Sequence, residues 1–218
     1  MIWDSWPWKV DLAQRTSRLE RRMRQKRWPE SSLVKMEQDI FFAAYVIRKL
    51  FEADKLSDDL ESMRLDVTVY YSTGKFADLL NWHHIEKLYD LETPEKGKHL
   101  SLAGFCNQII HSFVFVPYFD DEGGLSGFFF ASDRAKEELV HYMEMEVLVE
   151  ALNAVCEDDV VASVRIRDAS GQWKSVRKLS PSTASLANLP VKLSSKAQEG
   201  LRQYIAKLNC QGSAGSKS

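Results

Sequence analysis

The sequence predicts an α+β protein with a helix-rich core of long helices and two β-hairpins. Three segments carry this prediction. Residues 31–56 hold the strongest helical pattern, since their apolar residues recur at the spacing of one helix face. Residues 113–131 and 160–179 each contain two β-type runs around a short turn that includes glycine.

The helices are predicted from apolar spacing and from residues suited to helix ends. Residues 9–27 form a basic helix that ends ahead of Pro29, because a residue before proline avoids the α region. Ser31 or Ser32 is a natural N-cap for the helix 31–56. Further segments are predicted to be wholly or mostly helical: 76–91, 99–112, 132–159 and 194–208.

The strands are predicted from alternation and from β-branched or aromatic content. Residues 65–71, "LDVTVYY", read as a strand, and the segment "ETPEKGK" at 92–98 as a loop. The first hairpin turns at "DDEGG", and Pro117 places its first strand at a sheet edge. The second hairpin turns at "DASG".

The chain is long enough for one domain, which is predicted over residues 1–208 and followed by a flexible tail at 209–218. The helix 9–27 and the segment 160–208, a hairpin and a helix, form basic flanks of this domain. The net charges are +5 for residues 1–29, −15 for 30–159 and +8 for 160–218.

Basic residues cluster on both flanks and could contact the phosphates of RNA or DNA. The candidates are Arg15, Arg18, Arg22, Arg165, Arg167, Lys174, Arg177 and Lys178. The alternative is that the basic ends fold onto the acidic middle of the same chain.

A polar pair interrupts the apolar stretch "FCNQIIHSFVFVPYF". Asn107 and His111 lie one turn apart on the predicted helix 99–112 and therefore share a face. One interpretation is a working site. The other is two core polar groups that satisfy each other or the backbone, because a buried polar group without a partner costs about 2–7 kcal/mol.

This motif resembles that of the HEPN superfamily, in which a late helix carries an Arg, four to six residues and then a His. An Asn often follows the Arg directly, as Asn107 follows Cys106 here, but Cys106 stands in the place of the Arg. The resemblance implies a helical bundle, and it implies that active members cut RNA as dimers, with the His and Arg acting on the ribose 2′-OH and the phosphate. It also implies a setting in bacterial toxin–antitoxin or phage-defence systems.

The presence of Cys106 in the place of the Arg matters because phosphate chemistry needs a cation near the developing charge. An active site would therefore borrow an Arg for His111. Arg134 and His141 match the long form of the same pattern on the predicted helix 132–159, and they are further catalytic candidates.

Several classes of protein are not indicated. No stretch is long and apolar enough to span a membrane, and the N-terminus lacks the pattern of a secretory signal. Histidine and cysteine spacings match no metal motif, so neither a metal nor a cofactor is expected. Cys106, Cys156 and Cys210 stand far apart and are odd in number, which favours a reducing cytoplasm.

The leading hypothesis is a non-catalytic cytoplasmic binding or accessory protein that acts on a protein partner or as a homodimer. One alternative is a metal-independent ribonuclease that uses His111 with a borrowed Arg. Another is a nucleic-acid-binding module that acts through the basic ends.

Overall fold

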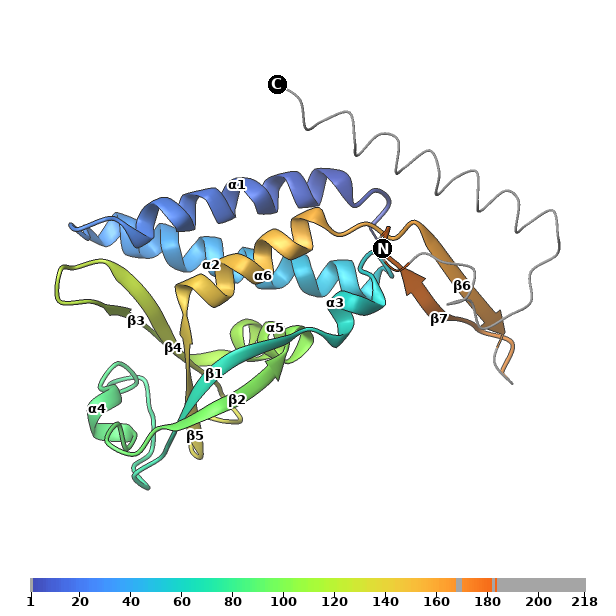
Figure 1. The fold of residues 1–218 in the computed structure, drawn as a ribbon. Helices are drawn as coiled ribbons and strands as arrows, with labels where there is room; N and C mark the ends of the chain where they lie inside the picture. Colours follow the sequence, from blue (N-terminus) through green and yellow to red (C-terminus); the bar gives the residue numbers. More distant parts are fainter. Residues whose placement is uncertain (1, 168–169, 182, 184–218) are drawn as a thin grey trace, which may run out of the picture. The chain divides into compact units, whose positions relative to one another are not determined.

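A five-stranded antiparallel sheet organises the larger part of the computed structural model, which describes residues 2–167, 170–181 and 183 (Figure 1). Side chains at 166 and 174–176 lie outside the description. The helices are α1 (Trp6–Met23), α2 (Glu30–Glu52), α3 (Asp58–Ser62), α4 (Ile85–Leu88), α5 (Leu102–Ile110) and α6 (Met145–Glu157). The strands are β1 (Arg64–Tyr71), β2 (Glu95–Ser101), β3 (Ser112–Phe119), β4 (Leu125–Ser132), β5 (Leu139–Glu144), β6 (Ala162–Arg167) and β7 (Trp173–Leu179).

The described residues form two compact units. The first holds residues up to 53 together with 60–157, and the second holds 54–59 together with the described residues from 158 onward. The single domain predicted over 1–208 stays a prediction, since it would span both units. The predicted helix 194–208 and tail 209–218 lie outside the described residues.

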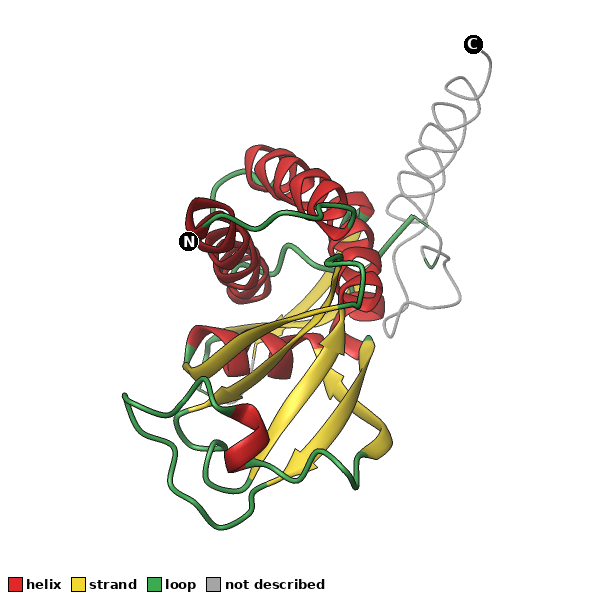
Figure 2. Ribbon diagram, turned by 90° about the vertical axis from the view of Figure 1, so that its left-hand side faces the viewer, coloured by secondary structure: helices red, strands yellow, loops and turns green. Residues whose placement is uncertain are grey.

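The sheet of the first unit has the strand order β2-β1-β5-β4-β3. Helices α5 and α6 pack on one of its faces, and α1 and α2 pack on those two helices. Figure 2 shows this helical layer on one side of the sheet. The Phe105 ring of α5 meets the Phe130 ring of β4 edge-on at 5.7 Å, and Phe41 of α2 meets Phe115 of β3 at 5.3 Å.

The opposite face of the sheet carries a second apolar cluster. Val114, Phe129, Ala131 and Val140 point from the strands, and the segment from 72 to 90 packs on them through four buried side chains. Those four are Ala77, Ile85, Leu88 and Tyr89. Both faces of the central strands are therefore buried, which explains the continuous apolar run "GFFFA" in β4.

The prediction of a core of long helices with two hairpins is wrong, although the α+β class holds. The described core is built around the five-stranded sheet. The main error is the predicted helix 132–159, whose first part is a turn and strand β5 and whose second part is α6. β5 lies between β1 and β4, so its conformation depends on two non-local pairings that local apolar spacing does not reveal.

Two smaller predictions are also wrong. The loop predicted at 92–98 begins edge strand β2, and the mostly helical segment predicted at 76–91 has only α4 as a helix. The helices at 9–27, 31–56 and 99–112, strand 65–71 and both hairpins are confirmed with shifted ends. None of the described helices has the length and apolar content that a membrane span requires.

Candidate functional site

The polar pair of α5 lies on the surface and not in the core. Asn107 and His111 are both exposed, so the interpretation of the pair as two core polar groups is wrong. Ser101 caps the start of α5 by accepting the Gly104 N–H at 3.0 Å, and His111 occupies the C-cap. Arg48 of α2 donates to the Asn107 amide oxygen, and its Nε donates to Glu52 at 2.9 Å. A cation therefore stands beside the pair.

Cys106 faces inward from the same helix. It is fully buried, and burial raises the pKa of its thiol to about 12. The thiol is thus neutral at physiological pH, and it supplies neither a cation nor a nucleophilic thiolate.

Arg134 and His141 do not share a helix, contrary to the prediction. Arg134 is exposed in the turn after β4, next to Asp133, whose N–H donates to the His111 carbonyl oxygen at 3.0 Å. His141 lies on β5, is 7% exposed and packs against the Phe130 ring at 5.4 Å. The structure therefore brings the backbone of Arg134 close to His111, while His141 is a core residue.

Burial determines the protonation state of His141. It lowers the pKa of this imidazole to about 4, so the side chain is neutral in the folded protein at pH 7. Its Nδ1 is buried and has no hydrogen-bond partner among the described residues.

Three predicted phosphate-binding arginines converge on one carboxylate inside the helical layer. Asp39 of α2 is 4% exposed. Arg18 donates to both its oxygens, at 3.1 and 2.7 Å, while Arg22 donates at 2.5 Å and Arg15 at 3.3 Å. Burial alone would raise the pKa of Asp39, but the hydrogen bonds from Arg18 and Arg22 outweigh it and hold the pKa below its usual range.

The basic residues of the hairpin β6–β7 also meet carboxylates within their own unit. Arg165 Nη2 lies 3.9 Å from Asp54 and Lys178 Nζ 3.7 Å from the same group, and Arg177 Nε lies 3.6 Å from Asp58. The Arg167 guanidinium lies over the Trp173 ring at 4.9 Å. Lys174 is on β7, and its side chain lies outside the description. These contacts match the alternative in which the basic ends pair with acidic residues of the chain.

An apolar loop, residues 75–81, is the feature that the sequence did not reveal. Phe76, Leu79 and Leu80 are 79%, 81% and 85% exposed. Single exposed apolar residues are ordinary, but three large ones on one short loop are typical of an interaction surface. The prediction of a helix here hid this loop, although Asp78 and Asn81 flank the leucines and are residues that form turns.

The apolar loop is held by its own polar side chains. The Asp78 carboxylate accepts the N–H groups of Leu80 and Asn81 at 2.8 and 3.0 Å. The Asn81 amide oxygen accepts the Asp78 N–H at 2.8 Å, and its nitrogen donates to the Phe76 carbonyl at 2.9 Å. Ala77 is buried in the cluster beneath the sheet. The loop therefore presents its apolar side chains from a fixed backbone.

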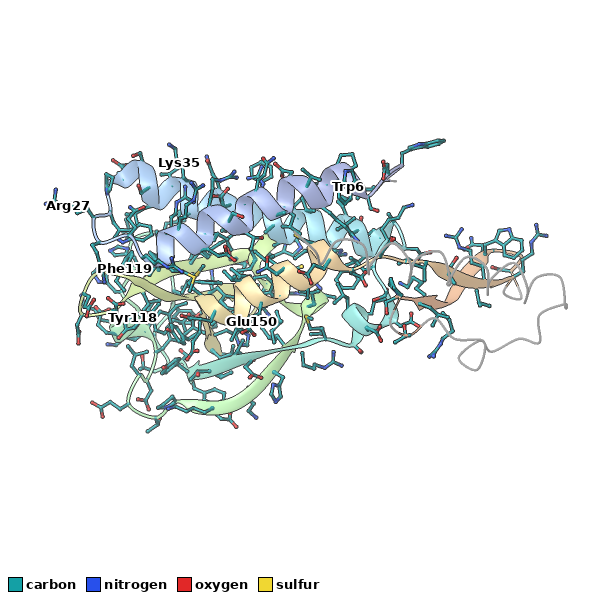
Figure 3. All side chains as sticks on the ribbon, turned by 45° about the horizontal axis from the view of Figure 1, so that its top comes forward. Trp6, Arg27, Lys35, Tyr118, Phe119 and Glu150 are labelled. Carbon is teal, nitrogen blue, oxygen red and sulfur yellow. The ribbon has the colours of Figure 1, made fainter. Side chains whose placement is uncertain are left out.

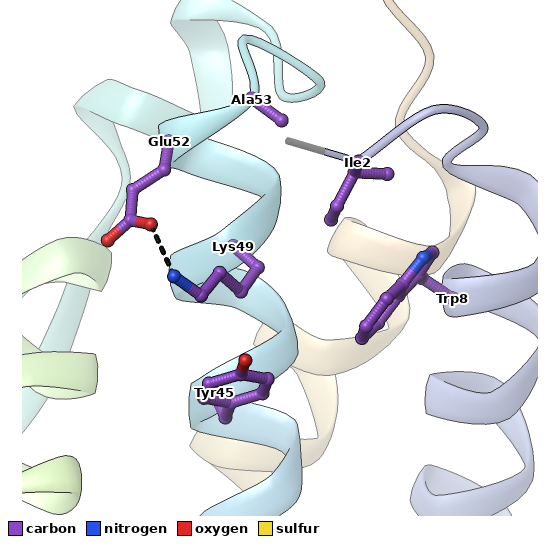
Figure 4. A pocket seen from close by; sticks show the side chains of 6 residues that line it. All are labelled: Ile2, Trp8, Tyr45, Lys49, Glu52 and Ala53. Carbon is purple, nitrogen blue, oxygen red and sulfur yellow. Dashed lines mark hydrogen bonds and ion pairs between the residues drawn. The ribbon is translucent and has the colours of Figure 1, made fainter.

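An aromatic groove lies between α1 and α2 in the first unit. Its cavity of about 440 Å³ is lined by Ile2, Trp8, Tyr45, Lys49, Glu52 and Ala53. In Figure 4, the rings of Trp8 and Tyr45 lie on opposite sides of this space. Lys49 donates to Glu52 at 2.7 Å at the rim. Trp6 projects nearby from the start of α1, whereas Arg27, Tyr118 and Phe119 mark the other end of the unit (Figure 3).

Comparisons with protein-family models, curated proteins and solved structures give no match. Across the part of the chain that the structure describes, no three His, Cys, Asp or Glu side chains come together as metal ligands. The candidate sites are thus defined by their geometry alone: the polar surface around Asn107 and His111, the apolar loop and the aromatic groove.

Proposed function

We propose that this chain is a non-catalytic binding protein that docks a partner protein through the apolar loop, residues 75–81. The observation that carries the proposal is the exposure of Phe76, Leu79 and Leu80, each at 79% or more, on a loop with a fixed backbone. Exposed apolar surface is unfavourable in water, and burial in a partner removes that cost.

The free energy gained by burying these three side chains limits the affinity of the complex. Burying a Leu or Phe side chain contributes about 1.5–3 kcal/mol, so the three together contribute about 5–9 kcal/mol. Association itself costs about 4–15 kcal/mol in lost translational and rotational freedom. The internal hydrogen bonds of Asp78 and Asn81 reduce the further cost of ordering the loop. One loop therefore supports a weak complex, and a stable one needs additional contacts.

The charges near the loop favour a protein over a lipid surface. Lys75 and Lys87 are balanced by Asp78 and Glu86, so the loop lacks the excess of basic residues that anionic membranes attract. The free thiols of Cys106 and Cys156 support a cytoplasmic setting, where cysteines remain reduced.

The test compares the wild type with a variant carrying Leu79→Asp and Leu80→Asp. A matched control carries Gln14→Asp and Ser17→Asp, which add the same charge to exposed positions of α1. All three proteins are expected to unfold within a few degrees of one another, because surface changes cost little. We expect quantitative affinity purification to lose a specific partner with the loop variant and to keep it with the control.

Two outcomes would contradict the proposal. One is an identical set of retained proteins for the loop variant and the wild type. The other is loop-dependent binding of the purified protein to vesicles of anionic lipid, which would assign the loop to a membrane surface.

A second candidate function, a HEPN-like ribonuclease, is favoured by two specific observations. Arg48 donates to the Asn107 amide oxygen, one helical turn from His111. Arg134 directly follows Asp133, whose N–H donates to the His111 carbonyl oxygen. Either Arg could supply the cation that Cys106 does not. His111 would then act on the ribose 2′-OH as an acid or base.

The ribonuclease candidate makes a prediction that separates it from the leading proposal. It predicts cleavage of mixed single-stranded RNA, but not of DNA, and a loss of at least ~100-fold on His111→Ala, the usual contribution of a general acid or base. Arg48→Ala should lose activity as well, while Arg24→Ala, which changes the exposed arginine at the C-cap of α1, should not. RNA left intact by the wild type would exclude this candidate.

The nucleic-acid-binding alternative has less support. Arg15, Arg18 and Arg22 are engaged by Asp39, and Arg165, Arg177 and Lys178 lie near carboxylates of residues 54–58. Arginines that are already paired add less to the attraction of a phosphate backbone than free ones do.

A further inference from the structure

We propose that the partner is a second copy of this chain, whose aromatic groove receives the apolar loop. This inference rests on the proposed function, because it names the occupant of the same loop. Phe76, Leu79 and Leu80 project from the loop, and a cavity of about 440 Å³ lined by Trp8, Tyr45 and Ile2 lies elsewhere on the same unit.

The aromatic groove suits an apolar guest. Trp8 and Tyr45 are 37% and 45% exposed, so their rings present surface that a guest would cover. Ile2 and Ala53 complete the apolar lining. Large aromatic side chains around an apolar guest are the usual centre of a protein interface.

The charges of the two surfaces are complementary. Lys49 and Glu52 form an ion pair at the rim of the aromatic groove, with a separation of 2.7 Å. Lys75 and Asp78 flank Phe76 on the apolar loop. The two ion pairs Lys75–Glu52 and Asp78–Lys49 could form between copies, which would fix the orientation of the loop.

The loop and the groove of one chain lie at opposite ends of the first unit, so they pair only between copies (Figure 1). The loop directly precedes α4, whereas the groove lies at the start of α1, beside the N-terminus. A dimer with two-fold symmetry would contain this contact twice and so double the buried apolar surface. In such a dimer each copy contributes both its loop and its groove to the interface, so the surface buried on each partner is larger than that of one loop alone.

The experiment is sedimentation velocity of the purified chain between about 1 and 200 µM, a range suited to a weak complex. We expect a concentration-dependent dimer for the wild type and a monomer for the Leu79→Asp, Leu80→Asp variant. Tyr45→Asp in the groove should also be monomeric, with Tyr45→Ser as a milder second variant if circular dichroism shows a folding defect. The control Gln14→Asp, Ser17→Asp should dimerise as the wild type does.

Mixing the variants gives the sharpest test. The loop variant keeps an intact groove and the Tyr45→Asp variant keeps an intact loop, so one contact is restored and a heterodimer should form at the highest concentrations. Formation of a dimer by either variant alone, or absence of heterodimer in the mixture, would overturn the pairing of loop and groove. A monomeric wild type would overturn the choice of a second copy, while the proposed function would still be tested by crosslinking from position 76 to another protein.

Discussion

Replacement of Asp39 with alanine is expected to lower the free energy of unfolding by about 3–5 kcal/mol, the usual cost of removing one partner from a buried charge cluster. The Asp39 carboxylate is nearly inaccessible and accepts hydrogen bonds from Arg15, Arg18 and Arg22. Without it, three guanidinium groups remain close together with Asp11 as the remaining carboxylate that pairs with one of them. Urea unfolding at pH 7 measures the loss.

The matched control for this prediction is Asp11→Ala. Asp11 pairs with Arg15 at 2.7 Å, but its side chain is 48% exposed, so its removal should cost less than about 1 kcal/mol. Because the pKa of Asp39 is lowered in the folded state, its stabilising effect is present above the unfolded pKa and is lost as pH falls through the folded value. Equal effects of the two substitutions would show that the arginine cluster does not hold α1 on α2.

His141 is expected to make the protein less stable in mild acid. Its pKa is about 4 in the folded protein and about 6.5 in an unfolded chain, so below pH 6.5 the unfolded state binds the proton that the folded state excludes. Stability is therefore complete above pH 6.5 and falls as pH drops toward 4. A shift of this size corresponds to about 3 kcal/mol over that interval.

The measurement is the free energy of unfolding of the wild type and His141→Leu at pH 7, 5.5 and 4.5. Leucine matches the apolar surroundings and does not titrate, so the variant should lose the excess acid sensitivity. His111→Gln, which changes an exposed histidine, is the control and should follow the wild type. A pH profile of His141→Leu that matches the wild type would contradict the assignment of His141 as the acid-sensitive residue.

Elements whose residues carry their own local signal could be predicted from the sequence. Helix α2 has a strong apolar face, and the hairpin β3–β4 has a glycine turn between two aromatic runs. Strand β5 was predicted as helix because "LVHYME" fits both periods over six residues. What decides its conformation is pairing with β1, about seventy residues earlier, and with β4. Strand β2, with Lys96 and Lys98, is an edge strand whose polar pattern resembles that of a loop.

Whether a candidate site could be predicted also depended on whether its signal is local in the sequence. The proximity of Asn107 and His111 followed from helical spacing, but their exposure depended on which face of α5 meets the sheet. The link from Arg48 to Asn107 joins residues far apart in sequence. The opposite net charges along the chain left nucleic-acid contact and internal pairing open, and they did not reveal that three arginines share Asp39. The apolar loop was missed because Phe76, Leu79 and Leu80 have the spacing of one helix face, which predicts a helix as readily as an exposed loop.

Photocrosslinking from the apolar loop in living cells tests the central claim most directly. The photoreactive amino acid p-benzoylphenylalanine in place of Phe76 keeps an aromatic side chain at the exposed position, and the same amino acid in place of Gln14 on α1 is the control. We expect a discrete adduct from position 76 and none of that size from position 14. An adduct of twice the chain mass identifies a second copy, and any other discrete mass identifies a different protein partner. Absence of an adduct from position 76, or the same adducts from both positions, would contradict the proposal that this loop docks a protein.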